Sequence, residues 1–380
     1  MNYYVIAGEP SGDLHGSNLL KALKQVDKDA HFRCWGGDLM QAQGGDIIKH
    51  YKELAFMGFV EVIINLKTIL KNISFCKQDI LQHKPDALIL IDYPGFNLRI
   101  AKWAKQQGIR VFYYISPTIW AWKENRINTV KENVERMYVI LPFEKKFYAD
   151  RGVEVDYFGH PLVDILKQEQ EKIIPRQDFL KKYNLSEKPI IALLPGSRAQ
   201  EVKYILPVMM QVVKYFPDYQ FVVSAISSLP KYLYEEPTKG FPVTIITNDT
   251  YSILHHAHTG IIKSGTSSLE AALFKLPHIV SYLGNGASFY IAKKLVGSRL
   301  QYVSLVNIIP NKEISKELLQ QDFTTPKIVE ELKLLLTDKK RYEVLNEYNL
   351  LISMLQEENI SLKIADSIYT RLKPTNASIN

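Results

Sequence analysis

The chain has 380 residues, of which 46% are hydrophobic and 23% are charged, as expected of a globular protein rather than a disordered or fibrous one. Its length exceeds one ordinary core and predicts two domains, and its formal net charge of +7 is too small and too dispersed to indicate nucleic-acid binding. That charge is compatible with a phosphorylated substrate or an anionic membrane surface. The two cysteines, Cys34 and Cys76, lack the spacing of a disulfide framework or a metal knot, which suits a reducing compartment.

The N-terminal residues 3–7 are an apolar run without a preceding basic region, so we expect a first β-strand and not a signal peptide. No apolar run approaches the roughly 18 residues needed to cross a bilayer, and we expect a cytosolic protein. The next stretch, GEPSGDLHG at 8–16, lacks the G-x-G-x-x-G spacing of a dinucleotide site. In this stretch Glu9, Ser11 and Asp13 are candidates for contact with a sugar, although Asp13 more readily caps the helix that follows.

Residues 56–73 have apolar side chains at helical spacing, on a stripe wider than one core-facing side needs. Periodicity alone favours a helix buried against a sheet. The alternative is a helix whose outer side enters a membrane interface or holds acyl chains, flanked by Lys67 and Lys71. The side chains that would do so are Val60, Val62, Ile63, Leu66, Ile69 and Leu70.

Short apolar runs alternate with helical patterns through the first half of the chain, most clearly at residues 3–7, 87–91, 110–115 and 137–141. This alternation predicts a parallel sheet covered by helices on both faces. Ligands of such sheets bind beyond the carboxyl ends of the strands, so the residues that follow each run are candidate site residues.

Asp92 comes directly after the run 87–91, in the stretch DYPGFN. A carboxylate at the carboxyl end of a central strand lies where a general base is wanted, although loop carboxylates often only bind neighbouring N–H groups. Asn97 in the same stretch and Ser116 after the run 110–115 are further candidates for contact with a sugar.

The most polar stretch in the middle of the chain is KQEQEK at 167–172, and we expect it to be a linker. The expected domains are therefore residues 1–166 and residues 173–349. The closing helices contain no strand-like run, and we expect the last of them, within residues 350–380, to pack back on the first domain.

The second half begins with IIALLPGSRAQE at residues 190–201, which predicts a strand, a tight turn and a helix. Free N–H groups and the dipole at the helix start form an anion site, which Gly196 lets a phosphate approach and to which Arg198 adds charge. Alternatively, this is one more β–α turn with a solvated arginine.

A second turn of this kind lies in IIKSGTSSLEAAL, residues 261–273. Thr266 and Glu270 are four residues apart on one helical face, where the carboxylate suits ribose hydroxyls while the N–H groups of the turn take phosphate oxygens. Alternatively, Ser267 and Glu270 cap the helix without any ligand. Together the two turns indicate a nucleotide diphosphate site formed by Gly196, Ser197, Arg198, Ser264, Gly265, Thr266 and Glu270.

Further strand-like runs at residues 221–224, 243–246 and 278–281 predict a second parallel sheet. Near its end, the stretch LVNII at 305–309 places Asn307 in a turn that we expect at the same edge.

Eight motifs in order make the chain resemble lipid-A-disaccharide synthase, a glycosyltransferase family of Gram-negative bacteria. They are GEPSGD (8–13), MGFVEV (57–62), DYPGFN (92–97), SPTIWAW (116–122), PFEKKFY (142–148), GHPL (159–162), LPGSR (194–198) and SGTSSLE (264–270). Each motif is weak alone, but together they span nearly the full length of the chain.

The resemblance implies a glycosyltransferase B fold of family 19, with two Rossmann-like parallel-sheet domains and the active site in the cleft between them. It implies transfer from UDP-2,3-diacylglucosamine to 2,3-diacylglucosamine 1-phosphate (lipid X), giving the β-1,6-linked disaccharide and UDP. By the same match, Asp92 is the proposed base, Arg198 and Glu270 are donor-site residues, and Asn307 lies near the nucleotide. The family is peripheral on the cytosolic face of the inner membrane, which implicates the helix at 60–70.

Two positions depart from the family pattern. Val306 stands where the family often has proline before the asparagine, which weakens the expected turn geometry around Asn307. Leu283 follows Tyr282 where many members carry a basic residue, so one possible phosphate contact is missing.

We expect a single inverting displacement, in which Asp92 takes the proton of the acceptor 6-hydroxyl and Arg198 meets the charge of the leaving UDP. No cofactor or metal is expected, because the only D-x-D sequence, at 27–29, lies in a polar loop after the first helix. Two rival hypotheses are a UDP-N-acetylglucosamine 2-epimerase of the same fold and a non-catalytic protein that binds a lipid or a nucleotide sugar.

Overall fold

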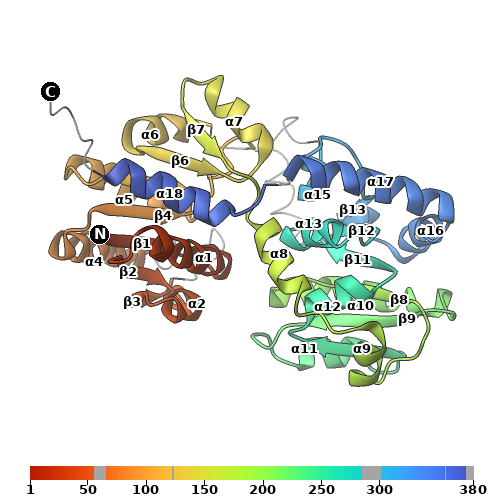
Figure 1. Cartoon of the computed structure of the whole chain (residues 1–380). Helices are drawn as coiled ribbons and strands as arrows, with labels where there is room; N and C mark the ends of the chain where they lie inside the picture. Colours follow the sequence, from red (N-terminus) through yellow and green to blue (C-terminus); the bar gives the residue numbers. More distant parts are fainter. Residues whose placement is uncertain (55–65, 122–123, 285–300, 356, 374–380) are drawn as a thin grey trace. The chain divides into compact units, whose positions relative to one another are not determined.

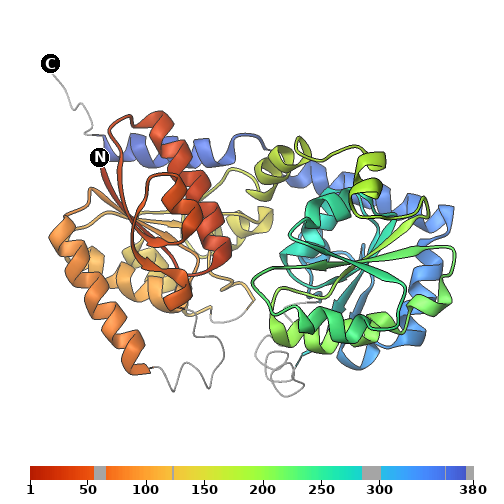
Figure 2. The same ribbon diagram turned by 90° about the horizontal axis from the view of Figure 1, so that it is seen from below.

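The computed structural model describes residues 1–54, 66–121, 124–284, 301–355 and 357–373. The chain forms two compact units, Met1–Pro161 with Glu357–Asn380 and Leu162–Gln356. Each unit is a parallel β-sheet with helices on both faces, which is the predicted α/β class (Figure 1, Figure 2). No helix in these described stretches is both long enough and apolar enough to cross a bilayer.

The first unit has a seven-stranded sheet of order β3-β2-β1-β4-β5-β6-β7 with parallel neighbours throughout. Its strands are β1 (Asn2–Ala7), β2 (His31–Gly36), β3 (Asp46–His50), β4 (Ala87–Ile91), β5 (Val111–Tyr114), β6 (Arg136–Val139) and β7 (Val155–Tyr157). Strands β4 and β5 are buried along their whole length because helices cover both faces. The strand order reverses at β1 and β4, and ligands of such sheets bind at the carboxyl ends of strands at this switch point.

Helices α1 and α18 pack side by side on one face of this sheet, while α4 and α5 contribute to the core on the other face. The predicted return of the last helix to the first unit is thereby confirmed. The helices of this unit are α1 (Pro10–Val26), α2 (Asp38–Ala42), α4 (Leu66–His83), α5 (Pro94–Gln106), α6 (Arg126–Asn133), α7 (Pro142–Ala149) and α18 (Ile360–Leu372).

The predicted wide apolar helix is described only from Leu66 onward, as α4. One side of α4 enters the core through Ile73, Cys76 and Ile80, and Ile69 packs partly against the same cluster. Leu70 is 53% exposed. The candidates Val60, Val62 and Ile63 and the side chain of Leu66 lie outside the described part of the chain.

The second unit has a six-stranded sheet of order β10-β9-β8-β11-β12-β13, again with parallel neighbours. Its strands are β8 (Ile190–Leu194), β9 (Gln220–Ala225), β10 (Val243–Thr247), β11 (Thr259–Lys263), β12 (His278–Tyr282) and β13 (Glu317–Leu319). Here the order reverses at β8 and β11, so the predicted PGSR and SGT turns follow the two adjacent strands of the switch point. Its helices are α8 (Leu162–Gln170), α9 (Arg176–Lys182), α10 (Ala199–Met210), α11 (Tyr232–Thr238), α12 (Thr250–His256), α13 (Thr266–Leu273), α15 (Leu305–Ile308), α16 (Thr325–Leu335) and α17 (Asp338–Leu355).

Two local expectations differ from the structure. The polar stretch at 167–172, expected as a linker, begins inside helix α8, which ends at Gln170. Asn307, expected in a turn, lies in the short helix α15. The chain passes between its two units at Pro161 and Leu162, and again at Gln356 and Glu357, where the sequence suggests 166–173 and 349–350.

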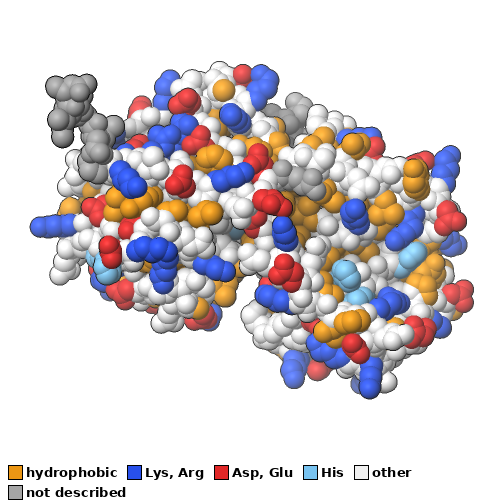
Figure 3. Space-filling model, in the orientation of Figure 1, with side chains coloured by type: hydrophobic (Ala, Val, Ile, Leu, Met, Phe, Trp, Pro, Cys, Tyr) orange, Lys and Arg blue, Asp and Glu red, His pale blue; other side chains and the backbone are white. Residues whose placement is uncertain are grey.

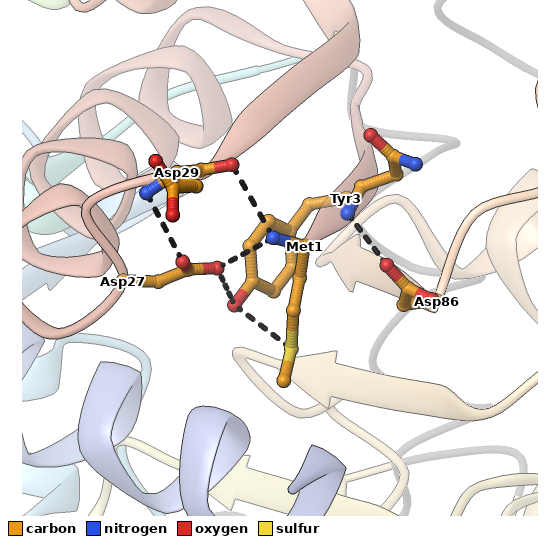
Figure 4. A network of polar contacts seen from close by, with 6 residues as sticks. Met1, Tyr3, Asp27, Asp29 and Asp86 are labelled. Carbon is orange, nitrogen blue, oxygen red and sulfur yellow. Dashed lines mark hydrogen bonds and ion pairs between the residues drawn. The ribbon is translucent and has the colours of Figure 1, made fainter.

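The D-x-D sequence after helix α1 forms a structural network (Figure 4). The Asp27 carboxylate accepts hydrogen bonds from the Met1 ammonium and from the Tyr3 hydroxyl, each at 3.0 Å. Its other oxygen accepts the N–H of Asp29 at 3.3 Å. This carboxylate therefore joins the first strand to the end of α1.

Basic and acidic side chains are interspersed on the face of the molecule shown in Figure 3. On that face the positive excess of the chain is not gathered into one patch, in agreement with the dispersed charge of the sequence.

Candidate functional site

In the first unit, the turn that joins β4 to α5 consists of Asp92 and Tyr93, both in the left-handed region with φ of 44° and 48°. Each such residue other than glycine costs about 1 to 3 kcal/mol unless its surroundings enforce the conformation. The Tyr93 ring lies over Gly8, which follows the neighbouring strand β1, and a Cβ atom at Gly8 would come within 2.4 Å of that ring. Glycine at position 8 is therefore required by this close approach.

Asp92 is half-buried beside Glu9, at the carboxyl ends of the adjacent strands β4 and β1. Burial and, to a smaller degree, the charge of Glu9 raise the pKa of the Asp92 carboxyl to about 6. A carboxyl group with this pKa is ionised at neutral pH and is a better proton acceptor than an ordinary aspartate.

The Asp13 carboxylate, a candidate for sugar contact, caps a helix, but it is not the helix on which the residue lies. One oxygen accepts the N–H groups of Gly37 at 2.8 Å and Met40 at 3.1 Å, and the other accepts that of Leu39 at 3.1 Å. These donors lie at the start of α2, so Asp13 on α1 fixes the loop between β2 and α2.

Two other acceptor candidates also bond to the protein interior. The Ser116 hydroxyl is buried and shares a hydrogen bond of 2.7 Å with the Tyr148 hydroxyl. The Asn97 side chain is fully buried and donates to backbone carbonyls of the β4–α5 turn. By contrast Glu9 is half-buried and Ser11 is exposed, so their side chains remain accessible.

In the second unit, the PGSR turn that joins β8 to α10 bends at Gly196, with φ of 120°. The N–H groups of Ser197 and Arg198, which were expected to face a phosphate, donate to the Glu201 carboxylate at 3.1 and 3.3 Å. The chain's own carboxylate thus occupies this helix start. The Arg198 side chain is 60% exposed and available to an anion.

Lys263 ends strand β11 next to β8 and was not among the predicted site residues. Its ammonium lies 2.7 Å from the Glu201 carboxylate and 5.9 Å from the centre of the Tyr282 ring. The same ammonium lies 3.8 Å from where a Cβ of Gly265 would stand, so it reaches both turns of the switch point. In the sequence, this lysine directly precedes the SGT turn, and that position could have indicated a cation at the anion site.

The SGT turn bends at Gly265, with φ of 153°, and α13 begins at the exposed Thr266. The buried Ser264 hydroxyl donates to the Val303 carbonyl at 3.3 Å. Glu270 accepts a hydrogen bond of 3.2 Å from the Tyr251 hydroxyl, and no side chain caps this helix start, which argues against the capping alternative. Burial raises the pKa of the Glu270 carboxyl to about 7, although the Tyr251 bond opposes the shift.

Asn307 is fully buried, and its side chain makes four hydrogen bonds in the loop that leads to β13. Its amide group donates to the Ser315 carbonyl at 2.7 Å and to Glu317 at 3.0 Å. Its oxygen accepts the N–H groups of Ile314 at 2.8 Å and Ser315 at 3.0 Å. The side chain therefore organises this loop.

Comparison with known proteins identifies the family. The sequence profile described as Lipid-A-disaccharide synthetase matches residues 3–367. A lipid-A-disaccharide synthase of Coxiella burnetii (strain CbuG_Q212) is 35% identical over 376 residues, covering 96% of this chain and 97% of that protein. An enzyme of the same name from Syntrophus aciditrophicus (strain SB) is 36% identical over 351 residues, covering 90% of each chain.

Solved structures share the fold. The UDP-GlcNAc 2-epimerase of Neisseria meningitidis bound to UDP-GlcNAc has a TM-score of 0.63 at 14% identity, covering 98% of this chain and 99% of that one. The glycotransferase of kitacinnamycin has a TM-score of 0.62 at 12% identity, covering 98% and 99%. At these identities the likeness concerns the glycosyltransferase B fold alone. The chain belongs to the lipid-A-disaccharide synthetase family and is a glycosyltransferase of lipid A disaccharide synthesis.

Proposed function

We propose that the enzyme joins UDP-2,3-diacylglucosamine to the 6-hydroxyl of 2,3-diacylglucosamine 1-phosphate (lipid X), with inversion and release of UDP. Membership of the family supports this reaction, and the half-buried carboxylate of Asp92 at the switch point of the first unit is the structural observation that carries it. An alcohol attacks efficiently only when its proton has an acceptor, and Asp92 has the position and the pKa of such an acceptor.

Asp92 accepts the proton of the acceptor 6-hydroxyl as the oxygen attacks the anomeric carbon of the donor. The bond between that carbon and the β-phosphate oxygen breaks, and its electron pair leaves with UDP. Attack from the face opposite UDP inverts the anomeric configuration and gives the β-1,6 linkage. Glu9 and Ser11, whose side chains are accessible after β1, are the proposed contacts to the acceptor sugar.

The second unit holds the donor and meets the charge that develops on the leaving diphosphate. Because Glu201 occupies the N–H groups of Ser197 and Arg198, we assign the diphosphate to other donors. These are the exposed Arg198 guanidinium, the Lys263 ammonium and the start of helix α13 at Thr266. Glu270, on the same helix, is the proposed partner of the ribose hydroxyls.

Helix α4 is the proposed contact with the cytosolic surface of the inner membrane and with acyl chains. Leu70 is 53% exposed and Phe75 is 43% exposed on this helix, and Lys67 and Lys71 are exposed beside them. We expect Leu70→Glu to reduce co-sedimentation with anionic phospholipid vesicles while the melting temperature stays unchanged. Unfolding of the variant would instead mean that Leu70 is needed for the core.

The reaction is tested by incubating the enzyme with both diacylated sugars and following UDP and the disaccharide by mass spectrometry. We expect both products, in equal amounts, and neither when the acceptor is omitted. UDP-N-acetylglucosamine alone should give no manno isomer, which an epimerase would form. Binding of the UDP-sugar without release of UDP on addition of acceptor would indicate a binding protein and reject the proposal.

A further inference from the structure

The backbone of Asp92 is fixed on both sides by hydrogen bonds. Its N–H donates to the Tyr114 carbonyl at 3.0 Å, which continues the ladder between β4 and β5. Its carbonyl accepts two side-chain donors, the Asn97 amide at 2.7 Å and the Tyr113 hydroxyl at 2.5 Å. The Asn97 amide also donates to the Ile91 carbonyl at 3.2 Å. Asn97 and Tyr113 are both fully buried, so water does not compete for these bonds.

This arrangement answers a specific conformational problem. Asp92 and Tyr93 both have positive φ, which an L-residue with a Cβ atom adopts only when its surroundings enforce it. Glycine would remove the strain at position 92, but it would also remove the carboxylate. The donors come from two different elements, since Asn97 lies on α5 and Tyr113 on β5. The carbonyl is therefore held from both sides of the turn.

We propose that Asn97 and Tyr113 are positioning residues for the glycosyl transfer, which hold the Asp92 backbone in its left-handed conformation and thereby aim the carboxylate at the acceptor. The inference rests on the proposed role of Asp92 as the base. It also gives Asn97 a role different from the acceptor contact expected from the sequence, because its amide group faces the protein interior.

Tyr113→Phe is the most selective test, because it removes only a hydroxyl group, which bonds to the Asp92 carbonyl and interacts with the Asn97 side chain. We expect kcat to fall about threefold to tenfold, with the donor KM unchanged within about twofold, because a hydrogen bond to the base's backbone is lost while the donor site is intact. Tyr138→Phe is the matched control. Tyr138 is equally buried on the next strand, β6, and its hydroxyl bonds to Ser367 at 3.0 Å, away from Asp92. It should keep the wild-type kcat.

Asn97→Ala removes two bonds and should lower kcat further, by roughly tenfold to a hundredfold, again with little change in donor KM. Adding Tyr113→Phe to Asp92→Asn should cause no additional loss of turnover, because the carboxylate to be positioned is already gone. If the Tyr113 change lowers the residual turnover of Asp92→Asn by the same factor as in the wild type, the inference is wrong.

The outcomes separate the inference from the proposed function. An inactive Asp92→Asn together with wild-type turnover in Tyr113→Phe and Asn97→Ala leaves the base in place and overturns the positioning role. Equal losses in Tyr113→Phe and Tyr138→Phe overturn it too, because they indicate a general effect of buried hydroxyls. Full turnover in Asp92→Asn would reject the proposed role of Asp92 as the base. A loss of turnover in Tyr113→Phe would then have a cause other than the position of the Asp92 carboxylate.

Discussion

The strand-to-helix turns at the switch points of the two units adopt positive φ angles with different residues. In the second unit, Gly196 and Gly265 provide the positive φ angles of 120° and 153°. In the first unit, Asp92 and Tyr93 adopt positive φ although both carry a Cβ atom. Where no side chain of the turn itself takes part in the chemistry, glycine suffices. Where the chemistry needs a side chain on the turn itself, glycine is excluded and neighbouring donors must enforce the conformation.

The two units also differ in charge at their switch points. The first brings two carboxylates together, Glu9 and Asp92, and burial, with a smaller contribution from Glu9, raises the pKa of the Asp92 carboxyl. The second brings Arg198 and Lys263 around one internal carboxylate, Glu201, at 3.9 and 2.7 Å. An acidic end suits acceptance of a proton, and a cationic end suits a diphosphate. Substitutions in each unit test whether the first accepts the proton and the second stabilises the diphosphate.

The largest expected effect is that of Asp92→Asn on turnover. An amide cannot accept the proton, so kcat should fall by about a hundredfold to ten-thousandfold while the donor KM changes little. The control is Asp86→Asn. Asp86 directly precedes β4, the strand that Asp92 follows, and its carboxylate accepts the Asn2 N–H at 2.7 Å. Steady-state kinetics of UDP release check this, and comparable activity in the two variants would remove Asp92 from the mechanism.

Arg198→Ala should lower kcat by about a hundredfold or more, because the charge of the leaving diphosphate loses its exposed cation. Lys203→Ala is the matched control, since Lys203 is an exposed cation on the same helix, α10. A loss of only a few-fold in the Arg198 variant would show that the leaving group is stabilised elsewhere.

Lys263→Met should raise the donor KM by about tenfold, with a smaller effect on kcat. The substitution removes an ammonium group that is proposed to contact the diphosphate and that pairs with Glu201. Lys182→Met provides the comparison, since that lysine pairs with Asp249 at 3.1 Å in the same unit. Titration with UDP measures the binding directly. Unchanged UDP affinity in the Lys263 variant would confine this lysine to holding the turn.

The pH dependence is the subtlest test. Asp92 must be ionised to act as a base, so kcat/KM, which reports the free enzyme, should rise with pH around a midpoint of about 6, and this limb should be absent from Asp92→Asn. A raised pKa means that the native state holds this proton more tightly than the unfolded chain. The corresponding stability is present below about pH 4 and is lost as the pH rises through about 6. Urea unfolding should therefore show Asp92→Asn to be more stable than the wild type at pH 8, by up to about 3 kcal/mol. Equal stability at pH 8 would contradict the raised pKa.

Much of the fold follows from the sequence because the central strands are buried on both faces and form uninterrupted apolar runs, as in β4 and β8. Strand β2 is less apparent because Arg33 interrupts its apolar run, and β3 begins with the charged Asp46, with which Arg33 forms an ion pair of 2.8 Å. Strands β7 and β13 have three residues each and lie at sheet edges, too short for a periodic signal.

The location of the candidate site also follows from the sequence, but the partners of its polar residues do not. Asp92 and Arg198 were placed from the rule that strand ends bind ligands. That Asp13 caps α2 depends on a contact between elements far apart in the chain. The Glu201 bond to the Arg198 N–H spans only three residues. The R-x-x-E spacing is that of a capping glutamate, so this contact of the donor site could have been predicted from the sequence.

Helix α18 completes the first unit although it is encoded after the whole of the second. Its apolar residues Ile360, Ile364 and Ile368 are buried, and it packs along α1. During synthesis, the second unit has all its strands before residues 360–372 leave the ribosome, whereas the groove beside α1 stays uncovered until then. The apolar surface that α18 covers in the finished protein is therefore exposed in the nascent first unit. It stays exposed for the time needed to translate about two hundred codons, at roughly 5 to 20 residues per second.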